Sequence, residues 1–360
     1  MSSQLAERVA KIKQWIGQCA ESYFQFSADP ETQAFCLARL RQLSSSDLLE
    51  QKVANELADH IWRPPHRLLF IISEKDPLGT LEGFLVAYLI GSKMRIKARH
   101  SRDWLIWLRQ ELGLSADDCE IYDWQSQRQD DQRLLSGVDT VLLAGGEDLI
   151  RHYRNITPVH IRLIELGPKI SGMALFGQQI PPIENIVKDT CLFLQCVCSS
   201  PRFILAEDES VAEYVYSQLQ QRLDQLPPLP ENQRLQQLTK SRELAMHHIL
   251  QPLLGKVAYS PASGWGVTLT HSFIPAFWLP HGFQIIVGPI EQNLYQAELR
   301  WPGRLQTLGY WGKPACPQTG SFTRYCPVGT MHARSLLAPH DGFFILPSLV
   351  RFIHREDYPL

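Results

Sequence analysis

The sequence shows almost no imbalance of charge, since 35 basic residues stand against 37 acidic ones and the formal net charge is −2. Surfaces that bind nucleic acid or an anionic membrane usually carry an excess of lysine and arginine. The chain also lacks an apolar run of transmembrane length, because residues 84–90 form far too short a stretch. We therefore expect no nucleic-acid partner and no membrane span.

Signals for metal binding and secretion are equally scarce. The eight cysteines include three at 191–198 whose C-x4-C-x-C spacing lacks the C-x-x-C knuckle of structural zinc sites, and no histidine lies nearby in sequence. Residues 1–7 lack the apolar core of a signal peptide. These absences predict a cytoplasmic protein with reduced thiols and no metal site.

The sequence does contain an alternation of strand-like and helix-like segments after a helical start. Residues 3–25 have helical periodicity, and the cap signals Asp29-Pro30 and Ser46-Asp47 predict two further helices before residue 60. Apolar runs then predict strands separated by helices, at residues 66–72, 93–97, 120–122, 138–143 and 161–166. This alternation predicts an α/β fold with a mainly parallel sheet.

The second half of the chain is less regular. Apolar spacing over residues 183–197 predicts a helix that leads directly into the cysteine run. Further helices are predicted at 211–223 and around 232–250, on either side of a proline-rich break. The last hundred residues are rich in glycine, proline and aromatic residues and predict only short strands.

Two breaks in these elements carry residues suited to acyl transfer. Cys198 lies in Cys196-Val197-Cys198-Ser199-Ser200-Pro201-Arg202, where an apolar segment meets a turn. Taken alone it reads as a small buried hydrophobic residue, but element boundaries are where reactive groups meet substrates. Glu165 ends a strand before Gly167-Pro168; such a residue is usually a solvated charge, yet here it is placed to act as a base toward a thiol or water. A thiol and a carboxylate together suit thioester chemistry.

Two other positions are candidates for holding a phosphate-bearing cofactor. Gly145 and Gly146 lie between a buried strand and a helix, where a backbone turn can approach a phosphate closely. The run is not G-x-G-x-x-G, and glycine is common in such turns. Lys97 ends a strand, where its ammonium group can contact a ribose or phosphate or can simply be a sheet-edge charge.

Taken in order, these segments resemble the aldehyde dehydrogenase superfamily, and within it the LuxC-type acyl-CoA reductase family, over roughly residues 60–350. The segments that carry the resemblance are Arg95-Ile96-Lys97, Leu142-Leu143-Ala144-Gly145-Gly146, Glu165-Leu166-Gly167-Pro168-Lys169 and the run around Cys198. Two segments near the C-terminus are also similar, Arg324-Tyr325-Cys326-Pro327-Val328-Gly329 and Pro339-His340-Asp341-Gly342.

The resemblance implies an aldehyde-dehydrogenase-like α/β fold. In it, residues 1–60 form an N-terminal helical segment, 61–166 a dinucleotide-binding domain, 167–345 a catalytic domain and 346–360 a C-terminal tail. It further implies that Cys198 is the nucleophile and Glu165 the base. The residues it assigns to cofactor binding are Lys97, Gly145 and Gly146.

The reaction implied by the resemblance is reduction of an acyl thioester, on CoA or an acyl-carrier protein, to an aldehyde. It passes through acyl-Cys198 and uses NADPH or NADH. An acyl-activating enzyme as partner and a homo-oligomeric state are left open, as are the chain length and carrier of the acyl group.

Two departures from the family pattern keep other functions open. The place of an oxyanion-holding asparagine is taken by Glu74-Lys75-Asp76-Pro77, and the run Ile285-Ile286-Val287-Gly288-Pro289 lacks a ribose-binding glutamate. An acyltransferase that keeps the acyl-cysteine step without reduction is one alternative, and a non-catalytic subunit of an acyl-activating complex is another. A Cys-His hydrolase using His247 or His248 is a third, although no nucleophile elbow surrounds Cys198.

Overall fold

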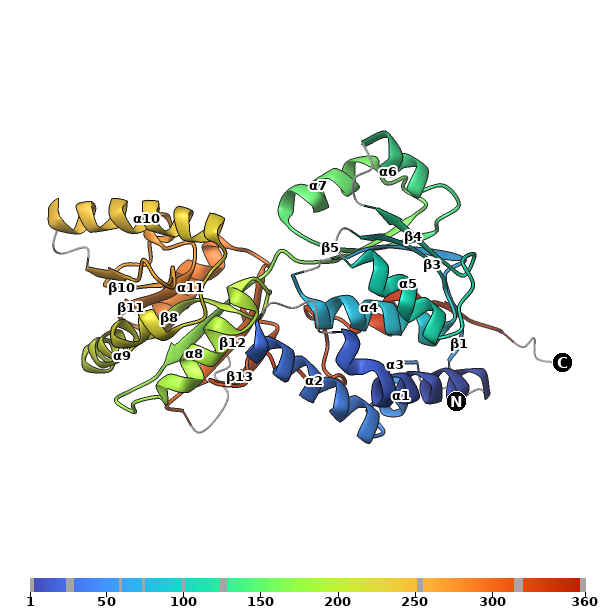
Figure 1. The fold of residues 1–360 in the computed structure, drawn as a ribbon, viewed down its shortest axis with the longest axis horizontal. Helices are drawn as coiled ribbons and strands as arrows, with labels where there is room; N and C mark the ends of the chain where they lie inside the picture. Colours follow the sequence, from blue (N-terminus) through green and yellow to red (C-terminus); the bar gives the residue numbers. More distant parts are fainter. Residues whose placement is uncertain are drawn as a thin grey trace. The chain divides into compact units, whose positions relative to one another are not determined.

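The computed structural model describes residues 3–23, 29–57, 60–72, 75–98, 101–123, 128–250, 255–313 and 320–356. The chain forms two compact units (Figure 1). Unit 1 contains Met1–Pro168 together with Ser335–Leu360, and unit 2 contains Lys169–Arg334. The expected α/β class with N-terminal helices is confirmed. The four-part functional division of the chain stays a prediction.

Unit 1 begins with helices and continues as an alternation of strands and helices. Its helices are α1 (Ser3–Tyr23), α2 (Pro30–Ser45), α3 (Leu48–Leu57), α4 (Pro77–Ile90), α5 (Arg102–Glu111), α6 (Arg128–Leu134), α7 (Glu147–Ile156) and α12 (Ile345–Leu349). Its strands are β1 (Ile61–Arg63), β2 (Arg67–Ile71), β3 (Lys93–Ala98), β4 (Cys119–Asp123), β5 (Thr140–Ala144), β6 (Arg162–Leu166) and β14 (Arg351–Ile353). Asp29 caps α2 by accepting from the backbone N–H groups of Glu31 and Thr32, as the cap signal predicted.

The main sheet of unit 1 is parallel and has the strand order β4-β3-β2-β5-β6. Helices α6 and α7 cover one face and α4 and α5 the other (Figure 1). Gly83 of α4 is required by close packing, since a Cβ there would come within 2.4 Å of the Phe70 ring. The chain runs outward through β2, β3 and β4 and then returns to β5, so the order reverses between β2 and β5. Parallel sheets bind ligands at the carboxyl ends of strands at such a reversal.

The C-terminal segment belongs to unit 1 because buried polar contacts attach it to α3. Lys52 donates to the carbonyl oxygen of Leu336 at 3.0 Å, and Glu56 accepts from the backbone N–H of Leu346 at 3.1 Å. Lys52 and Glu56 also pair with each other. Strand β14 pairs antiparallel with β1 to form a separate two-stranded sheet. Residues far apart in the sequence therefore build this unit together.

Unit 2 is a second α/β layer structure. Its helices are α8 (Ile183–Cys191), α9 (Glu209–Arg222), α10 (Glu231–Leu250) and α11 (Ile290–Arg300), with short 3-10 turns at Leu192–Gln195, Leu223–Gln225 and Pro275–Phe277. Its strands are β7 (Ile170–Leu175), β8 (Pro201–Ala206), β9 (Lys256–Tyr259), β10 (Gly266–Thr270), β11 (Gly282–Val287), β12 (Leu305–Trp311) and β13 (Arg324–Pro327). The sheet order is β13-β12-β7-β8-β11-β10-β9, and all pairs are parallel except β9 with β10.

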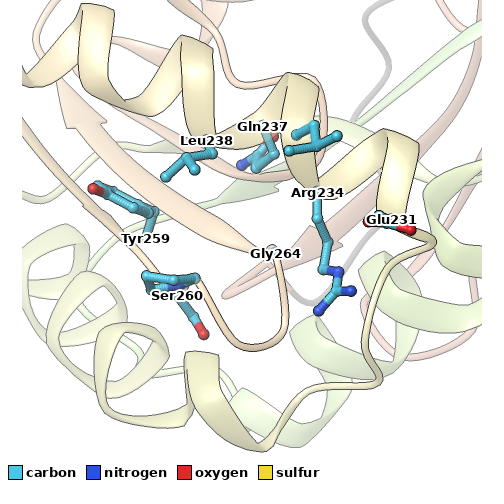
Figure 2. Close-up of a pocket in the computed structure, with 9 residues that line it drawn as sticks. Glu231, Arg234, Gln237, Leu238, Tyr259, Ser260 and Gly264 are labelled. Atoms are coloured by element: carbon cyan, nitrogen blue, oxygen red, sulfur yellow. The ribbon is translucent and has the colours of Figure 1, made fainter.

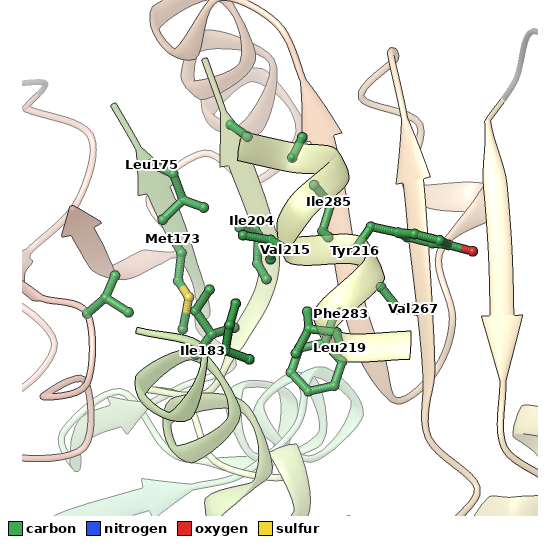
Figure 3. Packing of buried hydrophobic residues seen from close by; sticks show 14 of the residues in the cluster. Met173, Leu175, Ile183, Ile204, Val215, Tyr216, Leu219, Val267, Phe283 and Ile285 are labelled. Carbon is green, nitrogen blue, oxygen red and sulfur yellow. The ribbon is translucent and has the colours of Figure 1, made fainter. Parts of the chain in front are cut away.

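Alternating side chains of this sheet pack into two apolar layers, one on each face. On one face, Met173, Ile204 and Ile285 pack under α8 and α9, with Val215 and Leu219 of α9 directly over them (Figure 3). On the other face, the intervening positions such as Phe203 and Leu205 join the layer under α11. Because both faces are covered, the strands read as continuous apolar runs.

The predicted helix over residues 183–197 is wrong in its second half. Helix α8 ends at Cys191, and the three residues Phe193, Leu194 and Gln195 have positive φ angles of 58°, 49° and 57°. This left-handed backbone is unfavourable for residues with a Cβ and needs local support. Of the apolar residues that gave the helical pattern, Ile183 and Ile186 pack into the core from α8, whereas Leu194 packs against it from the turn.

Candidate active site

Cys198 lies in a turn, Cys196–Ser200, that connects this left-handed segment to β8. It is a partly exposed thiol, as is Cys196, whereas Cys191 is buried in the core. The turn precedes β8, so Cys198 lies at the amino end of that strand rather than at its carboxyl end. Its place at an element boundary agrees with the sequence, but no helix leads into it.

Gln195 fixes the entry to this turn. Its side chain is 4% exposed, and its amide group donates to the carbonyl oxygens of Pro201 at 2.7 Å and Gly282 at 2.9 Å. The side-chain amide oxygen of Gln195 accepts from the backbone N–H of Gly282 at 2.8 Å. These three bonds tie the left-handed segment to the starts of β8 and β11. They offset the cost of the positive φ angle.

A serine on the neighbouring strand holds the backbone of Cys198. Ser171 of β7 is fully buried, and its hydroxyl donates to the carbonyl oxygen of Cys198 at 2.6 Å. The same hydroxyl accepts from the backbone N–H of Thr307 at 3.2 Å. Ser171 therefore links Cys198 to β7 and β12 and fixes the main chain at that residue.

A histidine also reaches the turn. His332 Nδ1 lies 2.8 Å from the hydroxyl of Ser199, and His332 Nε2 lies 2.8 Å from the backbone carbonyl oxygen of Asp189. The ring of Phe193 packs against the imidazole with centroids 5.2 Å apart. His332 thus joins the residue after Cys198 to the end of α8.

Burial shifts two titrating groups in this region. It lowers the pKa of His332 to about 4, although the hydrogen bond to the Asp189 carbonyl oxygen favours the protonated ring. It also raises the pKa of the Asp189 carboxyl to about 6, although backbone N–H groups of Gly329 and Met331 donate to that carboxylate. Near neutral pH the imidazole is therefore neutral and Asp189 is ionised.

Glu165 stands on β6 in unit 1, and Arg154 of α7 engages both of its carboxylate oxygens. The hydrogen bonds that Arg154 donates to Glu165 raise the pKa of Arg154. A guanidinium group that pairs with both oxygens of a carboxylate stabilises the ionised carboxylate and so opposes its taking a proton. The predicted base is therefore paired in this conformation.

Lys97 on β3 is 4% exposed and pairs with Asp131 of α6. Asp131 also contacts His152 Nε2 at 2.9 Å and accepts from the Tyr153 hydroxyl at 3.1 Å. Burial would raise the pKa of Asp131, but hydrogen bonds from Lys97 and His152 outweigh it and lower the pKa. Lys97 is thus part of a buried network whose acidic centre the sequence did not single out.

Gly145 and Gly146 follow β5 at the point where the strand order reverses. Gly146 is the N-cap of α7 and has no side chain to cap the helix. A Cβ added at Gly146 would meet no other atom within 4 Å. Open space before an uncapped helix start fits a phosphate group. Glu147 and Asp148 add negative charge to the first turn but contact Arg151, at 2.9 and 3.5 Å. The turn therefore fits a phosphate-bearing cofactor through its backbone.

The five predicted site residues divide between the units. Cys198 is in unit 2, whereas Glu165, Lys97, Gly145 and Gly146 are in unit 1. Within unit 1, Lys97 and the glycine turn lie at the carboxyl ends of two strands of one sheet. Glu74, at the place of the missing asparagine, lies outside the described residues. Asp76, two positions on, caps α4 by accepting from the backbone N–H of Gly79.

Comparison with known proteins assigns the chain to a family. The family model described as acyl-CoA reductase (LuxC) matches residues 116–352. The chain belongs to the LuxC acyl-CoA reductase family. This membership confirms the resemblance seen in the sequence, and it supports an oxidoreductase of aldehyde-related chemistry. A search of curated proteins finds no match.

Solved structures similar to this LuxC-family chain are aldehyde dehydrogenases and a related oxidoreductase. A succinic semialdehyde dehydrogenase from Streptococcus pyogenes, in complex with NADP+, is 13% identical, with a TM-score of 0.73 over 99% of this chain and 91% of that one. Aldehyde dehydrogenase 21 from Physcomitrella patens is 10% identical, with a TM-score of 0.72 over 98% and 84%. An oxidoreductase from Marinobacter aquaeolei is 12% identical, with a TM-score of 0.71 over 97% and 84%. At these identities the similarity shows the aldehyde-dehydrogenase-like fold.

Other features of the LuxC-family chain lie apart from the predicted site residues. A pocket beside α10 is lined by Arg234, Gln237, Leu238 and Tyr259, among others (Figure 2). Gln237 is buried there and exchanges two hydrogen bonds with the backbone of His281. None of the helices in the described ranges is long and apolar enough to cross a membrane. Within those same ranges, no cluster of three or more His, Cys, Asp or Glu side chains is placed to hold a metal ion.

Sequence reasoning missed the residues that order the cysteine turn. They are Ser171, Asp189, Gln195 and His332, which lie on four separate segments. The histidines it considered, His247 and His248, lie instead in the last turn of α10. The only available signal for His332 was its position shortly after the family-like run that ends at Gly329.

Proposed function

We propose that this protein reduces an acyl thioester to an aldehyde through an acyl-Cys198 intermediate. The observation that carries the proposal is the Cys198 thiol, partly exposed in a turn ordered by Gln195 and Ser171, in a chain of the acyl-CoA reductase family. A thioester is well suited to this route, since it exchanges readily with a thiolate and accepts hydride. The substrate is an acyl group carried by CoA or by an acyl-carrier protein.

Cys198 acts first in this mechanism. Its thiolate attacks the acyl carbon, the bond from that carbon to the carrier sulfur breaks, and the carrier leaves as a thiol. Reduction at the same carbon gives a thiohemiacetal on Cys198, whose collapse releases the aldehyde and restores the thiolate. Ser171 and Gln195 fix the main chain of the turn that carries Cys198, so the thiol needs little rearrangement to react.

Glu165 is the proposed base for generating the thiolate. Because Arg154 holds both oxygens of its carboxylate, the base role requires that the ion pair open. Arg154 is largely exposed, with a side-chain exposure of 63%, so opening the pair costs little. Arg154 then sets how often Glu165 is available.

The residues proposed to hold a nicotinamide cofactor, NADPH or NADH, are Lys97, Gly145 and Gly146. When bound, that cofactor supplies the hydride. The Gly145-Gly146 turn would contribute the backbone N–H of Gly146 to a phosphate, in the space that Gly146 leaves open, because the N–H of Gly145 already donates to the carbonyl oxygen of Leu166. Lys97 would contact a ribose from the carboxyl end of β3 while staying paired with Asp131.

The test measures acylation and reduction together. The protein is mixed with a series of acyl-CoA thioesters and either NADPH or NADH, and the loss of reduced nicotinamide is followed alongside the intact mass. We expect both signals in the wild type, whereas Cys198→Ala should show no loss of reduced nicotinamide and no acyl group at position 198. Cys196→Ala is the matched control, since Cys196 is a second partly exposed thiol in the same turn and should be dispensable.

Each other outcome has a defined meaning. Acyl-protein without nicotinamide oxidation supports an acyltransferase, and the absence of both signals supports a non-catalytic subunit. Full nicotinamide oxidation in Cys198→Ala contradicts the assignment of the nucleophile. The preferred acyl chain and coenzyme come directly from the same series, and adding an acyl-activating enzyme tests for that partner.

A further inference from the structure

The proposed reduction leaves one chemically competent pair unused. Ser199 Oγ lies 2.8 Å from His332 Nδ1, and His332 Nε2 lies 2.8 Å from the backbone carbonyl oxygen of Asp189. A hydroxyl within hydrogen-bond reach of an imidazole that a third group orients is the arrangement of an activated nucleophile. All three residues belong to unit 2.

The direction of the Ser199 hydrogen bond follows from the partners of the ring. A carbonyl oxygen only accepts, so Nε2 must carry the hydrogen that points at Asp189. Burial keeps His332 neutral near pH 7, so Nδ1 is the unprotonated nitrogen. The Ser199 hydroxyl therefore donates to Nδ1, and its proton already points at the base.

The position of the pair indicates its substrate. Ser199 is the residue next to Cys198 and is partly exposed, and the imidazole that it contacts is the more buried member of the pair. An acyl thioester delivered to Cys198 therefore comes close to a second nucleophile. This choice of substrate class rests on the proposed function.

We propose that Ser199 is a second acyl acceptor and that, with His332, it hydrolyses acyl thioesters. His332 Nδ1 takes the proton from Ser199 Oγ as the bond from Oγ to the acyl carbon forms. The bond from that carbon to the carrier sulfur breaks, and the proton passes to the departing thiolate. Water then cleaves the serine ester, which gives a carboxylic acid and restores the hydroxyl. The sequence of steps consumes one water and no oxidant or reductant.

The structure also indicates that this hydrolysis is slow. Asp189 orients His332 through its neutral backbone carbonyl oxygen rather than through its carboxylate, which stabilises a forming imidazolium ion less than a carboxylate would. The lowered pKa of His332 keeps the ring able to accept a proton but makes it a weak base. Hydrolysis then drains bound thioester mainly when reduced nicotinamide is absent.

The experiment uses full-length Cys198→Ala protein without nicotinamide. Acyl-CoA hydrolysis is followed by thiol release, and a fluorophosphonate probe for activated serines is followed by intact mass and peptide mapping. We expect hydrolysis and labelling at Ser199. Adding Ser199→Ala removes both, and adding His332→Gln lowers both by about 100-fold. Ser200→Ala is the matched control, since Ser200 is the buried neighbour and should change neither signal.

Several results would overturn the inference. The pair is only structural if Cys198→Ala protein is neither labelled nor hydrolytic, or if Ser199→Ala hydrolyses at the same rate. Should Cys198→Ala fail to fold, labelling of the wild type and of Ser199→Ala decides the question, with circular dichroism to confirm folding. These assays measure hydrolysis and labelling, whereas reduction is measured separately with reduced nicotinamide. A wild type that hydrolyses acyl-CoA here but does not oxidise nicotinamide there refutes the proposed function and leaves this inference standing.

Discussion

Gln195 is the position where a single substitution most sharply tests the ordering of the cysteine turn. Replacing it by alanine removes three buried hydrogen bonds to the backbones of Pro201 and Gly282. Bonds of this kind contribute about 0.5–1.5 kcal/mol each, so Gln195→Ala should lower the free energy of unfolding by about 1.5–4.5 kcal/mol. Acylation of Cys198 should slow as well, because its turn loses its anchor.

The positive φ angle of Gln195 supplies an internal control. At φ 57° glycine avoids the Cβ clash that both glutamine and alanine carry, so Gln195→Gly should be about 1 kcal/mol more stable than Gln195→Ala. Gln195→Glu keeps the shape but turns a carboxylate oxygen toward two carbonyl oxygens, so it should be at least as damaging as alanine. The measurement is urea unfolding of all four proteins. A Gln195→Ala protein within about 0.5 kcal/mol of the wild type would refute the reasoning.

Three further outcomes follow from the same structure. Lys97→Met leaves the buried Asp131 carboxylate without its cation, and we expect a loss of about 3 kcal/mol in urea unfolding; an unchanged stability would mean that the pair is not buried in solution. The pKa of His332 is lowered from 6.5 to about 4 in the folded state, so its stabilising contribution is complete above pH 6.5 and falls by up to about 3 kcal/mol as the pH drops to 4. Relative to the wild type, His332→Gln should lose this sensitivity of the unfolding free energy to acid. Unfolding curves at pH 6.5 and pH 4 check this. Gly172→Ala would place a Cβ 2.2 Å from the Phe203 ring and should lower the melting temperature clearly, whereas normal thermal unfolding would show that the strands can separate at this point.

The parts of the fold that follow local rules could be predicted from the sequence. The cap at Asp29 and the buried strands of unit 1 depend on neighbours in the chain. The end of α8 could not be predicted in this way, because hydrogen bonds from Gln195 to β8 and β11 hold the left-handed turn that follows it. A helical apolar pattern cannot report such distant partners.

The candidate site divides in the same way. Cys198 could be singled out because it lies at a break in the chain and in a run similar to a known family. The partners of the predicted residues could not, since Asp131 lies 34 positions after Lys97 and His332 lies 133 positions after Ser199. Whether a lysine is a cofactor ligand or half of a buried ion pair depends on which carboxylate the fold brings to it.

The most direct test of the central claim is to locate the acyl group. Wild-type protein is mixed with acyl-CoA in the absence of nicotinamide, quenched in acid and digested, and the acylated residue is identified by mass spectrometry. We expect a thioester on Cys198 that hydroxylamine removes, with Cys196 unmodified. An acyl group on Cys196, or a protein that carries none while its thiols remain reduced, would contradict the account.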